Sequence, residues 1–234
     1  MKRLVFTLLT NLICICIAAE TINGTCNVAE DGTIATWSYD TESHAITLSS
    51  GSTPDFEKQG KDGSTNAPWN TYRNEICKVV IGENVPYVGE MAFFNYPQLS
   101  EVEFAGNNTT KGLGPSCFGN CKGITSINIP ASVETIGASA FANTNVASIN
   151  FAEDCKLKDI GVSAFQMSKI TKLTIPESVE LIREKAFNQC VNLESVIFSD
   201  NGKLISIGDH AFYLCEKIES VNIPSSVSFM KNLD

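Results

Sequence analysis

One short hydrophobic pattern repeats through the second half of the chain. Ahead of each repeat lies an alternating segment such as Ile127-Asn128-Ile129, whose first and third residues are apolar. This alternation predicts a short strand with one face inward. Each strand is followed by an Ala-Phe or Cys-Phe pair at intervals of 22 to 25 residues, and the phenylalanines are Phe93, Phe118, Phe141, Phe165, Phe187 and Phe212.

Between strand and phenylalanine, the units share a turn and the spacing Val-x-x-Ile-Gly-x-x-Ala-Phe. About seven buried side chains at roughly 2 kcal/mol do not offset the ordering of some 23 residues at roughly 1.5 kcal/mol each. A single coil therefore cannot fold alone, and the repeat predicts a solenoid of stacked coils with a parallel sheet. We expect it to span 77–234, with six coils and an incomplete seventh that begins at Val221-Asn222-Ile223.

The coils alternate in length. Their strand starts give coils of 23, 25, 22, 24, 23 and 25 residues. Later short coils carry Ile-Pro after the strand, whereas the long coils carry Phe104, Phe151 or Phe198 and about two extra residues, as in Asp154-Cys155. The alternation indicates duplication of a two-coil unit.

These repeats resemble the leucine-rich repeat of the BspA-like surface proteins. The fifth coil shows the resemblance well, with Leu173, Ile175, Pro176, Val179, Ile182, Ala186, Phe187, Cys190 and Leu193 in the family's slots. The departures, such as Arg183 for glycine and Cys117 for alanine, change no apolar core position. The resemblance implies an α/β leucine-rich-repeat solenoid with short helical or 3-10 turns. It also implies adhesion to host matrix or cell-surface proteins, or between cells.

The N-terminal part differs in kind. Lys2 and Arg3 precede an apolar run to Ile17 and small residues at Ala18 and Ala19, which is the layout of a secretory signal peptide over 1–19. We expect 20–76 to form a small β cap over the end of the solenoid. Within it, 36–40 and 45–48 alternate like the two strands of a hairpin. Trp37 and Trp69 are predicted to form the core of this cap, with sugar stacking as the less favoured alternative.

Composition and charge limit the kinds of partner and the location that the protein can have. The chain carries 17 basic and 26 acidic residues, a net charge of −9, and signal cleavage would leave no other apolar run able to span a membrane. Such an acidic chain is unsuited to nucleic acid, because phosphate contacts need clustered Lys and Arg. Three Asn-x-Thr triplets offer glycosylation acceptors at Asn23, Asn107 and Asn108 if the secreting host glycosylates. We expect a secreted or cell-surface location.

Candidate chemistry is sparse. His44 and His210 have no partners that the sequence can place, and no nucleophile, phosphate or metal motif occurs, so we expect no enzyme, no cofactor and no metal. Of the seven cysteines left after signal cleavage, Cys190 and Cys215 share one phase in adjacent coils and are a candidate disulfide. An odd number cannot all pair internally.

The remaining candidate is the sheet surface. Residues before and in the middle of each strand should point outward in two rows, namely Glu101, Glu103, Ser126, Asn128, Ser148, Asn150, Lys172, Thr174, Ser195, Ile197, Ser220 and Asn222. These rows predict an extended face for an extracellular matrix or cell-surface protein. The alternatives are a structural envelope or matrix component and a glycan-binding module.

The pattern places Met230 in the isoleucine slot and stops at Asp234, so the last strand is an uncovered edge. Either the chain is a fragment of a longer protein, or this coil pairs end to end with another molecule.

Overall fold

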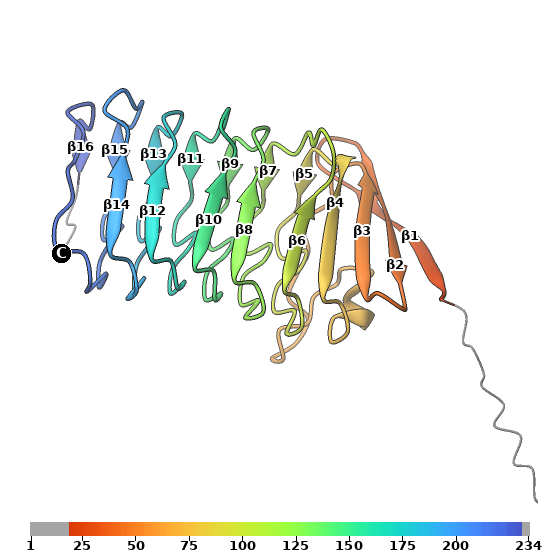
Figure 1. The fold of residues 1–234 in the computed structure, drawn as a ribbon. Coiled ribbons are helices and arrows are strands. Elements are labelled where there is room, and N and C mark those ends of the chain that lie inside the picture. Colours follow the sequence, from red (N-terminus) through yellow and green to blue (C-terminus); the bar gives the residue numbers. More distant parts are fainter. Residues whose placement is uncertain (1–18, 231–234) are drawn as a thin grey trace, which may run out of the picture.

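In the computed structural model of this protein, residues 19–230 are described. The predicted signal peptide lies outside them except for its last residue. The coils stack along one axis in a β-solenoid (Figure 1). Each of the six complete coils contributes one front strand, and these are β4 (Lys78–Asn84), β6 (Glu101–Phe104), β8 (Ser126–Ile129), β10 (Ser148–Phe151), β12 (Lys172–Ile175) and β14 (Ser195–Phe198). The predicted solenoid with parallel strands is confirmed.

A second parallel sheet runs behind the front strands without interruption. Its seven members are two residues long: β5 (Tyr87–Val88), β7 (Gly112–Leu113), β9 (Thr135–Ile136), β11 (Asp159–Ile160), β13 (Leu181–Ile182), β15 (Ser206–Ile207) and β16 (Phe229–Met230). Ile136, Ile160 and Ile182 are consecutive register partners, as the repeat requires. Met230 is paired with Ile207, which confirms its predicted slot in the seventh coil.

The repeat phenylalanines form a continuous ring stack inside the solenoid. Neighbouring ring centroids from Phe93 to Phe212 lie 5.3 to 5.5 Å apart, with nearly parallel planes. All six rings are buried. Because each ring contacts the rings of the neighbouring coils, the core is continuous along the axis and no coil has a core of its own.

The expected helical turns do not form. Among the described residues, the only helix is the 3-10 turn η1 (Asn70–Tyr72), which lies in the cap. In each coil, one residue on either side of the Ala-Phe pair has a positive φ between 52° and 63°, as at Ser139 and Asn143. The amides of Ser139, Phe141 and Asn143 then donate to carbonyls of the next coil at 2.7 to 2.8 Å. Left-handed residues therefore direct this side of the coil into bonds between coils, and a helix cannot propagate.

The N-terminal cap continues the front sheet. Strands β2 (Ile34–Asp40) and β3 (Ala45–Ser50) form the predicted antiparallel hairpin, and β3 pairs in parallel with β4. A further strand, β1 (Thr21–Val28), was not predicted. Its mostly polar sequence lacks the alternation that predicts a strand. Glycine is required at position 24, because a Cβ there would lie 2.4 Å from the indole of Trp37.

Trp69 joins the cap to the ring stack. Its fully buried indole stacks on Phe93 at 5.3 Å, and its Nε1 donates to the Ala92 carbonyl at 2.9 Å. Trp37 and Phe56 pack edge-on against it. The predicted core role of both tryptophans is confirmed, and burial leaves neither indole face open to stack on a sugar.

Candidate functional site

The two predicted rows do line up on the front strands. Register pairs join Glu101 to Lys78, Asn128 to Asn150, and Thr174 to Ile197. Of the ten row residues on strands, Ser195 is half-buried and the other nine are exposed. The predicted strand at 221–223 is wrong: residues 219–224 form no strand, so Ser220 and Asn222 are exposed without belonging to the sheet.

The front sheet is not continuous, and its breaks follow the coil lengths. β4 pairs with β6, β8 with β10, and β12 with β14, but β6 and β8 share no ladder, nor do β10 and β12. Both breaks follow a long coil, where about two extra residues come directly after the strand. The absent strand at 221–223 lies after the third long coil, at the equivalent step. The two-coil period seen in the sequence therefore shapes the surface.

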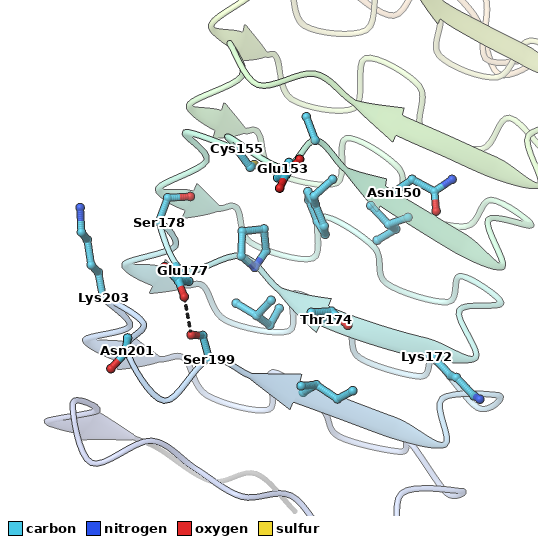
Figure 2. A pocket seen from close by; sticks show the side chains of 16 residues that line it. Asn150, Glu153, Cys155, Lys172, Thr174, Glu177, Ser178, Ser199, Asn201 and Lys203 are labelled. Carbon is cyan, nitrogen blue, oxygen red and sulfur yellow. Dashed lines mark hydrogen bonds between the residues drawn. The ribbon is translucent and has the colours of Figure 1, made fainter.

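A groove opens at the break between β10 and β12 (Figure 2). It has a volume of about 860 Å³. Phe151 and Ile175 form part of its wall, and Ile197 of β14 borders it. Thr174 lies in the middle of the lining, with Lys172 and Lys203 toward opposite ends (Figure 2). The Ser199 hydroxyl donates to Glu177 at 2.9 Å, and both residues line the groove.

A second, smaller groove of about 440 Å³ lies at the equivalent break between β6 and β8. Phe104 and Pro130 line it in the slots that Phe151 and Pro176 occupy in the larger groove. Asn150, Phe151 and Ala152 line both grooves. The two grooves therefore form one trough across β6 to β14, with two equivalent openings two coils apart.

The charges of the trough differ from end to end. Lys78 Nζ contacts the carboxylates of Glu101 at 2.8 Å and Glu103 at 2.6 Å, and these hydrogen bonds raise the pKa of Lys78. The acidic end is thus partly neutralised within the chain, because one cation faces two carboxylates. Lys172 and Lys203 have no ion-pair partner among residues 19–230, and neither do Glu153 and Glu177, so the other end offers unpaired charges of both signs to a ligand.

Polar groups fill the middle of the trough. The Asn150 side-chain amide donates to Asn128 Oδ1 at 2.8 Å, which holds both amides in the plane of the sheet face. The Thr174 hydroxyl has no hydrogen-bond partner within the described part of the chain. The arrangement offers hydrogen-bond donors and acceptors beside apolar walls, which suits the binding of a ligand.

Eight of the twelve predicted residues line the trough: Glu101, Glu103, Ser126, Asn128, Asn150, Lys172, Thr174 and Ile197. Ser148, Ser195, Ser220 and Asn222 do not. Other lining residues lie at the end of a strand or after it and could not be recognised from the outward rows, including Phe151, Glu153, Glu177, Ser199 and Lys203. The length of the long coils could have indicated these residues. A long coil has about two extra residues directly after its strand, and phenylalanine at the position where a short coil has isoleucine.

The other candidate positions lie away from the trough. Asn23 and Asn107 are exposed, whereas the Asn108 side-chain nitrogen donates to the carbonyls of Ile81 and Gly82 at 3.0 Å, so a sugar there would displace both bonds. His44 accepts or donates a bond with the Tyr39 hydroxyl at 2.9 Å, and His210 contacts Asp209. Residues 19–230 contain no group of three side chains fit to hold a metal, and no helix long and apolar enough to cross a membrane.

Two solved structures of bacterial proteins share this fold. A leucine-rich repeat protein from Bacteroides ovatus superposes with a TM-score of 0.52 and 26% identity, over 85% of this chain and 54% of its own. One from Eubacterium ventriosum gives a TM-score of 0.51 at 19% identity, over 89% of this chain and 62% of its own. This chain thus spans less than two thirds of either protein. No curated protein matches the chain.

The family comparison covers the solenoid. The model of the BspA type leucine-rich repeat region matches in six copies over residues 70–158 and 111–233. Leucine-rich-repeat proteins are generally binding or scaffold modules without catalytic activity. Together with the repeat register, the ring stack and the parallel sheets, this match shows that the chain belongs to the BspA-type leucine-rich-repeat family.

Proposed function

We propose that this protein is a secreted or cell-surface binding protein whose trough holds an extended segment of an extracellular matrix or cell-surface protein. The location is supported by the signal-peptide pattern of the first nineteen residues and by the family. The binding role is supported by the trough itself, because solenoids commonly bind partners along an extended face.

The observation that carries the proposal is the repetition of the groove. A structural scaffold needs only a closed front sheet, and pairing β6 with β8 and β10 with β12 would give one. Instead, the long coils of β6 and β10 open the sheet and leave Phe104 and Phe151 half-buried beside polar donors and acceptors. Two equivalent openings two coils apart suit one extended ligand that contacts both, since the second contact forms at a high effective concentration.

The test is capture of a partner by the immobilised full chain from solubilised matrix and cell-surface proteins. The double variant Asn128→Arg/Asn150→Arg places two long cations between the openings, where both wild-type side chains are exposed. We expect it to lose the partner, with a drop in affinity of about a hundredfold or more for a central contact.

The control is Asn23→Arg/Asn27→Arg. It makes the same change of charge at two exposed positions of β1, on the cap and outside the trough. Retained binding by this control and lost binding by the trough variant support the proposal. Equal binding by both variants, each shown to be folded by its near-ultraviolet circular dichroism, contradicts it. Binding of matrix glycans that survives protease treatment of the extract would favour the glycan alternative.

A further inference from the structure

Three cysteines occupy one slot, three residues after the ring-stack phenylalanine, and are held in the same way. The thiols of Cys121, Cys190 and Cys215 donate to the carbonyls of Phe93, Phe165 and Phe187, one coil earlier, at 3.0 to 3.3 Å. All seven cysteines of the described residues are free thiols. The slot thus favours a small side chain with a weak donor, and cysteine supplies both.

Cys190 and Cys215 differ from Cys121 because they are neighbours. The slots beside Cys121 hold Tyr96 and Thr144, whereas Cys190 and Cys215 lie in adjacent coils. Their coils are joined immediately before this slot, where the Gln189 amide donates to the Tyr213 carbonyl at 2.8 Å. Neighbouring coils at a ladder spacing fall within the Cα separation of 4.4 to 6.8 Å that a disulfide requires.

We infer that Cys190 and Cys215 form a disulfide when the protein enters an oxidising compartment. The two thiols lose two protons and two electrons, and a low-molecular-weight disulfide accepts them to become two thiols. One sulfur–sulfur bond is formed and one is broken. The bridge replaces two weak thiol–carbonyl bonds, and the solenoid backbone does not have to rearrange.

The hydrogen bonding of the pair favours this exchange. Contacts with Cys215 and with Ser168, whose Oγ lies 3.2 Å from Cys190 Sγ, lower the pKa of Cys190. The same contact with Cys190 raises the pKa of Cys215. Cys190 is therefore the sulfur that more readily becomes a thiolate, the form that attacks a disulfide. Burial keeps access low, since Cys215 is 8% exposed and Cys190 is fully buried.

The bridge would also act on the trough. The loop that it closes contains β14, and with it Ile197, Ser199 and Lys203 of the groove wall. A disulfide there fastens the sixth coil to the fifth behind that wall. For a loop of this size, the chain-entropy estimate predicts a folding equilibrium constant larger by a few hundredfold.

The experiment is peptide mapping of the full chain secreted from an oxidising host, with free thiols alkylated in denaturant before digestion under non-reducing conditions. We expect one cross-linked peptide joining Cys190 to Cys215. Cys121 should be alkylated in the same sample, because the equivalent slots of both adjacent coils hold no cysteine. A reduced sample should yield all three as alkylated thiols.

Alkylation of both Cys190 and Cys215 in the oxidised sample overturns the inference, as does a cross-link of either one to another cysteine. The variant Cys215→Ser should leave Cys190 alkylatable and remove the increased resistance to urea in oxidised protein. A Cys215→Ser variant that is still more resistant to urea when oxidised than when reduced would show that another bond accounts for the stability. Neither result depends on finding a partner, so the test is separate from that of the proposed function.

Discussion

Consecutive coils are connected by two kinds of step, and the two kinds differ only in the front sheet. From a short coil to a long one, as from β8 to β10, the front strands pair over their full length. From a long coil to a short one, as from β10 to β12, they share no ladder, and a groove opens. The second sheet and the ring stack cross both kinds of step unchanged.

The residues that stabilise this solenoid are separate from the surface at which we propose binding. The slots that stack on themselves, such as Phe141 and Ile136, hold the coils together at every step. The extra residues of a long coil lie between the front strand and the second sheet, where they change only the front surface. The front sheet can therefore open at alternate steps while the core remains continuous.

The largest expected effect concerns the ring stack. Phe141→Ala removes a fully buried ring between two neighbours at 5.4 and 5.3 Å, and should cost about 3–5 kcal/mol of unfolding free energy. Phe151→Ala removes a half-buried ring beside the groove and should cost only about 1–3 kcal/mol. Urea denaturation measures both. Equal losses would show that the groove phenylalanine belongs to the core, and the comparison would fail.

The next prediction concerns the step from the long coil of β10 to the short coil of β12. Deleting Asp154 and Cys155 shortens the long coil to the length of a short one, and should let β12 pair with β10. We expect hydrogen exchange of the backbone amides at 172–175 to slow by about tenfold or more, with loss of partner binding.

The matched control for this deletion is Asp154→Ser/Cys155→Ser, which changes the same side chains and keeps the length. It should exchange like the wild type. If the deletion variant folds and its exchange at 172–175 is unchanged, coil length is not what opens the sheet.

The smallest expected effect concerns an exposed ion pair between the coils of β8 and β10, whose front strands are paired. Lys158 Nζ lies 2.8 Å from Glu134 Oε2, and its hydrogen bond and charge lower the pKa of Glu134. Since the folded pKa lies below the unfolded one, the stabilisation is present above the unfolded carboxyl pKa, about 4.3, and is lost as the pH falls through the folded value.

Lys158→Met removes this pair. Its melting temperature should fall slightly below that of the wild type near pH 7, and the gap should close in acid. A gap that stays constant from neutral to acidic pH would assign the loss to packing of the lysine stem. Because the pair is exposed, we expect a small difference throughout.

The repeat made most of the fold predictable. The spacing of Ile136, Phe141 and their equivalents gave the coil, its inward slots and the register, because a solenoid must place the same residue type at the same height in every coil. The cap hairpin followed from alternation, and the coil lengths already contained the two-coil period. Strand β1 could not be found this way, since its fit depends on Gly24 lying under Trp37, a contact across two strands.

The trough could be predicted from the sequence only in part. The strand pattern placed Asn128, Asn150 and Thr174 on one outward face, because side chains alternate along a strand. It could not show that the face divides after each long coil, or that Phe151 and Lys203 line the opening, because the pairing of strands depends on how two neighbouring coils accommodate extra residues. The two left-handed residues of each coil were equally hidden, since they are stabilised by backbone bonds to the next coil.

The amino-acid sequence by itself determined the solenoid, its core slots and its outward rows, because these depend on periodicity within the chain. Only the tertiary structure decided that the front sheet opens after a long coil, and which side chains line the opening. The sequence contained the two-coil period, but whether two neighbouring strands pair depends on how their coils accommodate the extra residues.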